Sequence, residues 1–257
     1  MGLGRSAAVV IGGFPLGESD RVVRFYSRDY GRLHGVARAA RRPRSRFTGA
    51  LELLTLGELV FFDTGRSDLV RVDHFDIVQP FARVREDLAR LAEGAWIVEC
   101  VGRLTAERDP HPTLFGLLVR ALRSLEAAAP PRRVAVVFGV RCVDALGHRL
   151  RTDACVVCGR ARPARGAVAV DVAAGGTVCA RCATGDLPRV DAATLAALGR
   201  LRALAWREAL GMALGGAEAE LRGLLDLQVA HLSGQPTRTS RFVREVERFA
   251  EAWGSRR

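Results

Sequence analysis

The chain contains no lysine, so arginine supplies all 39 of its basic side chains. Arginine suits phosphate because its planar guanidinium can donate two parallel hydrogen bonds, whereas lysine offers a point charge. A GC-rich genome that replaces lysine by arginine would produce the same composition. It would not gather the arginines into one part of the chain, so their distribution is the informative feature.

Long apolar runs and familiar catalytic motifs are also missing. No stretch approaches the ~18 uncharged residues of a membrane helix, and the opening MGLGRSAAVVIGG lacks the features of an export signal. The chain has no GxxxxGK followed by Ser or Thr, no GxSxG and no HExxH, and its five histidines are scattered. These absences predict a cytoplasmic protein that binds its target and is not an enzyme.

Positive charge gathers in one segment. The net charge is +11, and residues 21–47 hold nine arginines and one acid, Asp29, which gives +8 in 27 residues. The densest part reads ARAARRPRSRF and contains Arg38, Arg41, Arg42, Arg44 and Arg46. A solvated charged face normally mixes both signs. We therefore predict a surface that binds a polyanion, extended by Arg24 and Arg32 on nearby strands; a merely soluble loop is the alternative.

The first part of the chain has the pattern of short β-strands. Strand-like runs at residues 7–11, 22–27, 32–37, 58–63 and 69–77 are separated by turns rich in Gly and Asp. Val70 and Val72 alternate in one phase and Phe75 and Ile77 in the other, which predicts a bulge between them. Five or six short strands in roughly 80 residues indicate a small barrel, and the OB-fold is the obvious candidate.

Aromatic side chains are concentrated in the same region. Nine of the sixteen lie between residues 14 and 81. Most should be core residues, because aromatics favour strands. Tyr26, Tyr30 and Phe47 lie near the arginines and are candidates for stacking on bases, with core packing as the alternative for each.

After Pro80 the apolar period becomes helical. Val84, Leu88, Leu91, Ala95 and Val98 recur at spacings of three and four, which predicts one helix with one apolar face. Further helices are expected at 113–128, at 134–145 with Gly147 as C-terminal cap, after Asp191 as N-cap, and at the C-terminus. The apolar residues of the last two helices are Leu195, Leu198, Leu201 and Ala205, and Phe242, Val246, Phe249 and Trp253. The stretches GMALGGAE and SGQPT separate these later helices.

Four of the six cysteines form two CxxC pairs. Cys155, Cys158, Cys179 and Cys182 are spaced C-x2-C-x20-C-x2-C around a β-like spacer at 167–172. Two such turns bring four sulfurs to one tetrahedral ion, which predicts a structural zinc with no open coordination position. Two redox pairs or two disulfides are the alternatives, and disulfides would need an oxidising compartment.

Other residues around this segment have smaller roles. Gly159 gives the first CxxC turn its backbone freedom, and His148 is a possible substitute ligand. Arg160, Arg162, Arg165 and Arg181 can screen the anionic centre. Cys100 and Cys142 fall on apolar helix faces and are predicted to be buried thiols.

His74 lies between Asp73 and Asp76, a combination that occurs in metal sites. Strand alternation predicts that both carboxylates lie off the face of the histidine. We therefore expect an exposed strand here.

Three segments carry a resemblance to a known family. They read GESDRVVRFYSRDYGRLHGVARAARRPRSRFTGALEL at Gly17–Leu53, VDALGHRLRTDACVVCG at Val143–Gly159 and LSGQPTRTSRFV at Leu232–Val243. The first is the most specific, because a hairpin is followed by a basic R-x-x-R-R-P-R-S stretch. On these residues the chain resembles the bacterial recombination mediators of the RecO family over nearly its whole length. Its four cysteines match the zinc-containing members.

The resemblance implies both a fold and a function. We expect an OB-fold at 1–80, a helical domain at 81–149 and 187–257, and a zinc-ribbon-like insert at 150–186. RecO proteins bind single- and double-stranded DNA, anneal complementary strands and, with RecR, load RecA onto strands coated by single-strand-binding protein (SSB). The family therefore implies a nucleoid-associated DNA repair protein whose loop arginines contact phosphates. An SSB tail, which is acidic with an apolar tip, would suit a basic, partly apolar groove on the helical domain.

Two other functions stay open at this point. A nucleic-acid enzyme would need a base or nucleophile near the arginines, for which His34 and Asp29 are present without a motif. A scaffold would use the basic stretch to bind an acidic protein in place of DNA.

Overall fold

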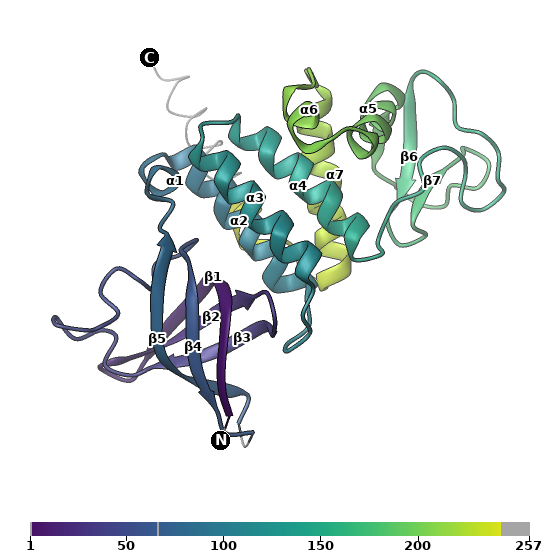
Figure 1. Ribbon diagram of the computed structural model, residues 1–257. Coiled ribbons are helices and arrows are strands. Elements are labelled where there is room, and N and C mark those ends of the chain that lie inside the picture. Colours follow the sequence, from purple (N-terminus) through teal and green to yellow (C-terminus); the bar gives the residue numbers. More distant parts are fainter. Residues whose placement is uncertain (1, 66, 243–257) are drawn as a thin grey trace, which may run out of the picture. The chain divides into compact units, whose positions relative to one another are not determined.

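The computed structural model describes residues 2–65 and 67–242. The chain divides into two compact units, Met1–Ala128 and Ala129–Arg257, and Figure 1 shows the elements of each. The predicted division into an OB-fold, a discontinuous helical domain and an insert stays a prediction, because the boundary between the two units falls within the helical part. Among the described residues, no helix combines the length and the low polarity that a membrane crossing requires.

The β-strands of the first unit form an OB-like barrel. The described strands are β1 (Gly2–Leu16), β2 (Asp20–Ser27), β3 (Gly31–Ala37), β4 (Leu56–Asp63) and β5 (Leu69–Gln79). Each pairs with two others, in the order β1-β2-β3-β5-β4 and back to β1. Only the β3–β5 pair is parallel among these described strands. The sequence prediction of a small barrel is confirmed.

Alternate side chains of these strands fill the barrel. On β2, Val23 and Phe25 are fully buried, whereas Arg24 between them is exposed. The ring of Phe25 packs against Phe75 of β5, with centroids 5.4 Å apart. Phe47, from the loop after β3, belongs to the same core. Because burying such a side chain contributes roughly 1.5–3 kcal/mol, the core also holds this loop in place.

The predicted bulge in β5 is confirmed. Phe61 of β4 pairs with Val72, and the residue before it pairs with His74, so Asp73 is the extra residue in the ladder. Burial changes phase at the same point, because Val72 and Phe75 are both buried. The bulge keeps Val70 and Val72 before it and Phe75 after it inside the barrel, whereas Ile77, predicted to follow Phe75, is 47% exposed.

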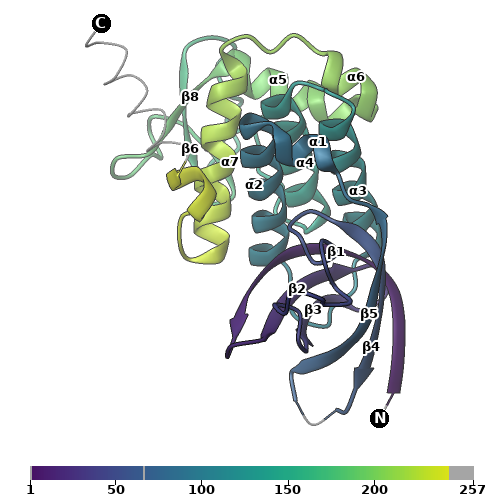
Figure 2. The same cartoon turned by 90° about the vertical axis from the view of Figure 1, so that its left-hand side faces the viewer.

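Three described helices complete the first unit: α1 (Ala82–Glu86), α2 (Leu88–Leu104) and α3 (Pro112–Glu126). Helices α2 and α3 contact each other, and Figure 2 shows the helices from a second side. The single helix predicted through Val84 and Val98 is broken at Asp87. The backbone of Asp87 is extended, and its carboxylate accepts a hydrogen bond from the Arg90 N–H at 2.9 Å. Asp87 therefore caps a new helix, and the change of direction leaves Leu88 64% exposed on a face predicted to be buried.

The second unit combines helices with a small sheet. Its described helices are α4 (Pro131–Ala145), α5 (Ala192–Ala203), α6 (Trp206–Gly211) and α7 (Ala217–Ser233). Strands β6 (Ala167–Asp171), β7 (Gly176–Val178) and β8 (Arg189–Asp191) pair in the order β7-β6-β8. Helix α7 packs against α4 and α5. The predicted helices at 113–128 and 134–145 are confirmed as α3 and α4.

The predicted helix ends of this unit are largely confirmed. The carboxylate of Asp191 accepts a hydrogen bond from the Ala193 N–H at 2.7 Å and caps α5. Gly147 follows α4 with a φ of 82°, which glycine adopts freely. Ala205 is not part of α5 but is the extended residue before α6. Val246, Phe249 and Trp253 of the predicted C-terminal helix lie outside the described residues.

Candidate nucleic-acid interface and metal centre

Residues 38–55 connect β3 to β4, and we call them the arginine loop. Phe47, Ala50 and Leu51 are at most 5% exposed and belong to the barrel core. A tight turn links two of them, because the Ala50 N–H donates to the Phe47 carbonyl at 3.0 Å. The apolar side of the loop therefore faces the barrel, and its charged side faces solvent.

A second anchor joins the arginine loop to the tip of the β1–β2 hairpin. The Arg41 N–H donates to the Ser19 carbonyl at 2.9 Å, and its guanidinium Nη1 donates to the Gly17 carbonyl at 3.1 Å. The Ala39 N–H donates to Asp20 Oδ1 at 2.8 Å. This bond, helped by the Ser19 hydroxyl, lowers the pKa of Asp20 below its usual 3.8. The ionised carboxylate holds the loop and the hairpin together.

The loop arginines point outward. Arg38, Arg41, Arg42, Arg44 and Arg46 are all exposed. In the part of the chain that the structure describes, no ion pair joins any of them to an acid. The Arg46 guanidinium lies over the ring of Phe47, 4.9 Å from its centroid. The structure therefore brings the five predicted residues onto one solvent-facing loop with their charge available.

A hollow beside the loop adds one residue that the sequence analysis left out of the site. Arg21 and Arg42 line it together with Pro43 and Thr48. Arg21 pairs with Ala37, the residue that precedes the loop. Its membership of the basic segment 21–47 was the sequence signal for this role.

The two predicted strand arginines differ. Arg24 is exposed and crosses β1 above Gly12, where a Cβ would lie 2.6 Å from its Nη2. Arg32 is partly buried: its Nη1 donates to the carbonyl of Gly102, and its Nη2 lies 3.7 Å from Glu107 Oε1. Gly102 is in the last turn of α2, where carbonyls lack helical partners. These contacts favour a structural role for Arg32, and its predicted contact with DNA stays a prediction.

Two of the three aromatic candidates are core residues. Tyr26 is 0% exposed, and its ring packs against Phe115 at 6.5 Å. Phe47 is 3% exposed. Neither can present a ring face to a base. Tyr30 is 38% exposed, and its ring meets Phe61 at right angles, with centroids 5.1 Å apart.

Cys155, Cys158, Cys179 and Cys182 form the cysteine centre. Their four sulfur atoms all lie within 4.8 Å of one another, and those of Cys158 and Cys179 are 3.7 Å apart. A tetrahedral ion with metal–sulfur bonds of about 2.3 Å separates its ligands by roughly 3.8 Å. The geometry therefore fits one ion bound by four cysteines, and the predicted convergence of the two CxxC pairs is confirmed.

Two tight turns build this centre. The Gly159 N–H donates to the Cys155 carbonyl at 2.9 Å, and the Cys182 N–H donates to the Cys179 carbonyl at 2.9 Å. Gly159 has a φ of 73°, a conformation that residues with a side chain rarely adopt. Cys179 follows β7 directly, so the small sheet fixes the second pair.

The electrostatics of the sulfurs favour a bound cation. Backbone N–H groups of Cys179 and Cys158 lower the pKa of Cys155 to about 6. Hydrogen bonds to the sulfurs of Cys179 and Cys158 raise the pKa of Cys182 to about 12. Four thiolates at these distances repel one another, so full ionisation needs a positive ion. Thiolates in a tetrahedral set suit a soft divalent ion such as zinc.

The remaining residues of this region take secondary places. Among the described residues, the group able to hold a metal comprises the four cysteines, without His148. Three of the four predicted screening arginines are exposed, whereas Arg162 donates to the Ala192 carbonyl at 3.2 Å. Cys100 and Cys142 are each 1% exposed, as predicted, and burial raises the pKa of Cys142 to about 12.

The predicted geometry around His74 is wrong. Its Nδ1 lies 3.1 Å from Asp73 Oδ2, and its Nε2 lies 3.7 Å from Asp76 Oδ2. The bulge at Asp73 disturbs the alternation, and Asp76, two residues on, shares the face of His74. Their side chains are between 38% and 71% exposed, so the predicted exposed strand is confirmed.

The candidates for a catalytic base are each engaged elsewhere. His34 Nδ1 lies 3.5 Å from Glu107 Oε1, and burial lowers the pKa of His34. Asp29 accepts hydrogen bonds from the Arg28 guanidinium at 3.0 Å and from the Ser6 hydroxyl at 2.8 Å. The hydrogen bond from Arg28 is the main cause that lowers the pKa of Asp29.

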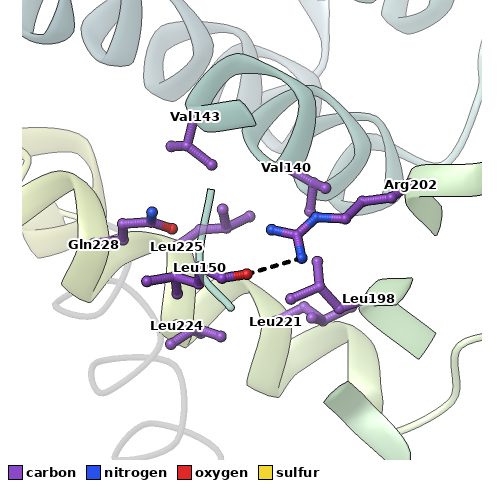
Figure 3. A pocket seen from close by; sticks show the side chains of 9 residues that line it. All are labelled: Val140, Val143, Leu150, Leu198, Arg202, Leu221, Leu224, Leu225 and Gln228. Carbon is purple, nitrogen blue, oxygen red and sulfur yellow. Dashed lines mark hydrogen bonds between the residues drawn. The ribbon is translucent and has the colours of Figure 1, made fainter. Parts of the chain in front are cut away.

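Figure 3 shows a small pocket inside the second unit. It is lined by Val140, Val143, Leu150, Leu198, Arg202, Leu221, Leu224, Leu225 and Gln228. Its free volume of about 10 Å³ is at the lower limit of what one water molecule needs. Arg202 donates to the Leu150 carbonyl at 3.2 Å and pairs with Asp144 at 2.8 Å. The pocket is therefore a gap in the core, and Arg202 ties α4 and α5 to the segment that leads into the cysteine centre.

Comparison with known families matches both halves of the chain. The model described as "Recombination protein O N terminal" matches residues 1–81, which include the arginine loop. The model described as "Recombination protein O C terminal" matches residues 85–240, which include the cysteine centre.

Several curated proteins are similar over most of the chain. The DNA repair protein RecO of Anaeromyxobacter dehalogenans strain 2CP-C is 38% identical over 246 residues, which cover 93% of this chain and 94% of the relative. The DNA repair protein RecO of Myxococcus xanthus strain DK1622 is 35% identical over 241 residues, with coverage of 93% and 96%. That of Listeria monocytogenes serotype 4a strain HCC23 is 26% identical over 235 residues, with coverage of 90% for both chains.

Proposed function

Since the chain belongs to the RecO family of DNA repair proteins, we propose that it is a recombination mediator that binds DNA without catalysing a reaction. It binds single- and double-stranded DNA and anneals complementary strands. One observation carries the proposal: five exposed arginines project from a loop whose backbone is anchored on the barrel core. Loss of conformational freedom on binding weakens an interface, and an anchored backbone reduces that loss.

Annealing asks for contacts that ignore sequence. Guanidinium groups on phosphate oxygens fix the position of a strand but carry no sequence information, and the bases stay free to pair. Arg38, Arg41, Arg42, Arg44 and Arg46 supply such contacts in the proposal, and Arg24 extends them along β2. Arg32 stays in the predicted set, although its contacts with α2 favour a structural role.

Salt titration of single-strand binding tests this proposal. The slope of log affinity against log salt is about −0.7 per phosphate contact on a single strand. Changing Arg41, Arg42 and Arg44 together to Ala should therefore reduce the steepness of the slope by about 2. Changing the exposed Arg83, Arg120 and Arg200 to Ala removes the same charge elsewhere and serves as the control. Equal slopes for both variants would show that the arginine loop does not bind phosphates.

The partners proposed for the chain follow from its family. With RecR, it would load RecA onto single strands coated by SSB, in the bacterial nucleoid. The acidic tail of SSB would be attracted to a basic surface that also has apolar parts. A hollow in the second unit, lined by Arg149, Leu150 and Gly199 among others, supports such a contact, and Arg149 is its cation of choice because Arg151 pairs with Asp153 in the same lining. Arg149→Glu should then weaken binding of an acidic tail peptide, whereas the exposed Arg207→Glu should not.

We also propose that the cofactor of this chain is a zinc ion. Cys155, Cys158, Cys179 and Cys182 would hold it, and the ion would supply a structural cross-link between the two CxxC turns. With four protein ligands, no coordination position is left for a substrate. A structural ion agrees with a protein that binds and positions DNA.

Nuclease and ATPase assays on the pure protein separate this proposal from a nucleic-acid enzyme, and competition with oligonucleotides separates it from a protein scaffold. Turnover that follows the protein through purification would favour the enzyme. Failure of oligonucleotides to displace an acidic partner, together with no shift of labelled DNA, would favour the scaffold.

A further inference from the structure

An exposed aromatic residue lies at the end of the β1–β2 hairpin, close to the arginine loop. Phe14 is 52% exposed, and Leu16, two residues on, is 41% exposed. Large apolar side chains that remain in water together often mark a binding surface. The other aromatics near the arginines are unsuitable, because Tyr26 and Phe47 are buried and the ring of Tyr30 packs against Phe61.

The strand register places Phe14 on the same outer face as Arg24. Gly12 pairs with Arg24, and Phe14 pairs with Val22. Directly paired residues point to the same side of a sheet, and Val23, between Val22 and Arg24, points into the barrel core. A bulge between Val10 and Gly12 sets this phase. The aromatic ring and the cation therefore share one side of the hairpin.

Gly12 leaves room for the Arg24 side chain to lie across β1. A Cβ on Gly12 would lie 2.6 Å from Nη2 and 3.0 Å from Nε of Arg24, so only a residue without a side chain lets the guanidinium lie against β1. Gly12 also has a φ of 153°, which residues with a side chain rarely adopt. The guanidinium thus lies against β1 at Gly12, two residues before Phe14.

The same hairpin continues into the arginine loop through hydrogen bonds. Arg41 donates to the carbonyls of Gly17 and Ser19, as described above. Phe14 is three residues from Gly17, which is about 10 Å along an extended strand. The exposed ring and the Arg24 guanidinium therefore lie on a hairpin whose tip is hydrogen-bonded to the arginine loop.

We propose that Phe14 stacks on an unpaired base of single-stranded DNA whose phosphates are bound by Arg24 and the arginine loop. The proposal rests on the DNA-binding function proposed above and adds a site that prefers single strands to duplexes. Base–aromatic stacking tolerates any sequence, because every base has a flat π-face. The bases of a duplex are already stacked on one another, so Phe14 has no partner there. The positive charge of Arg24, on the same face of the hairpin, favours a strand of DNA over an apolar protein segment as the binding partner of this ring.

The test compares Phe14→Ala with wild-type protein on two strands of equal length, one normal and one without bases. Phe14→Ala should weaken binding to the normal strand about tenfold, the effect of removing one base–aromatic stack. Binding to the abasic strand, binding to a duplex and the salt slope should not change, because the phosphates and arginines are intact. Phe14→Tyr, which keeps an aromatic ring, should bind the normal strand as tightly as wild-type protein does. Val78→Ala, which truncates a 64% exposed side chain on β5, is the matched control.

The outcomes separate this inference from the proposed function. If Phe14→Ala bound the normal strand as tightly as wild-type protein does, the stacking role would be overturned. Phe14 would then be open to an apolar protein partner. A loss of equal size on normal and abasic strands would overturn it too, since the ring would then act without a base. No binding by wild-type protein at low salt would overturn the DNA-binding function and the stacking role together.

Discussion

Arginine has two distinct uses in the first unit, and burial separates them. Arg42 is exposed and lines the hollow beside its loop. Arg32, ten residues earlier, reaches the last turn of α2 and Glu107. A guanidinium bonded to helix carbonyls is no longer free to wrap a phosphate. Membership of a basic segment therefore does not by itself assign a residue to the DNA.

Arg32→Ala should lower the free energy of unfolding. Its side chain is 22% exposed, and a hydrogen bond from a charged group contributes about 1.5–3 kcal/mol. Arg5→Ala, which removes the exposed pair with Glu58, should cost at most about 1 kcal/mol. Urea unfolding of the two variants measures the difference. Normal stability of Arg32→Ala combined with weaker DNA binding would identify Arg32 as a DNA contact instead.

Asp20 should couple the anchoring of the arginine loop to pH. Its carboxylate accepts the Ala39 N–H, and its pKa in the folded protein is lowered below 3.8. A lowered pKa means that this contribution to stability is present above pH 3.8 and is lost as the pH falls through the lowered value. The protection of the Ala39 amide from hydrogen exchange, taken relative to its intrinsic rate at each pH, should therefore fall below pH 3.8 and, at neutral pH, in Asp20→Ala.

Glu18→Ala is the control for this measurement, because it removes an exposed acid from the same hairpin tip. If its exchange at Ala39 matched that of Asp20→Ala, the effect would come from charge and not from the hydrogen bond.

Among the elements, the arginine loop departs furthest from a typical loop. Connections without regular structure that exceed roughly 12–15 residues are uncommon in compact domains, and this one runs from residue 38 to 55. Burial of Phe47 and Leu51 in the barrel core offsets the entropic cost of ordering so long a loop. The result is a charged surface on a backbone that the core and the hairpin both hold.

The cysteine centre should depend on its ion. Chelation, or Cys155→Ser with Cys158→Ser, should abolish binding of about one zinc per chain and remove the protection of β6 and β7 amides from hydrogen exchange. Val157→Ser changes an exposed residue between the same two cysteines and should keep the metal. Elemental analysis and hydrogen exchange check both variants. Metal-free protein with undisturbed exchange in β6 and β7 would contradict the assignment.

At the scale of the whole molecule, charge is distributed unevenly. Residues 21–47 carry +8 of the net +11, and the barrel places most of that charge on one loop and its neighbouring hairpin. A local positive surface attracts polyanions at long range, and salt screens this attraction. The protein should therefore bring two DNA strands together by charge.

The full-length protein should anneal complementary strands without a nucleotide cofactor. The reason is that phosphate contacts hold both strands while their bases remain free to pair. The annealing rate, measured by the quenching of paired fluorophores, should fall steeply as the salt concentration rises. The variant with Arg41, Arg42 and Arg44 changed to Ala should be slower at every salt concentration. Annealing that required ATP, or that was insensitive to both changes, would contradict the mechanism.

Local patterns in the sequence were enough for most elements. Alternation predicted the strands and the bulge, because each side chain of a strand takes one of two faces. The N-cap at Asp191 and the glycine turn at Gly147 depend on a few neighbouring residues, and both were found as predicted. The prediction of one helix through Val84 and Val98 was wrong. Asp87 can either continue a helix or cap a new one, as it does here, and periodicity alone does not distinguish the two.

The sequence by itself determined the charge of the arginine segment, the ligand set of the cysteine centre and the family, because these depend on residue type and spacing. Only the tertiary structure decided which arginines are exposed and which aromatic rings are open. Burial of Tyr26 and Phe47, the engagement of Arg32 and the exposure of Phe14 all depend on what packs against each residue. Those neighbours are far apart along the chain, so no local pattern records them.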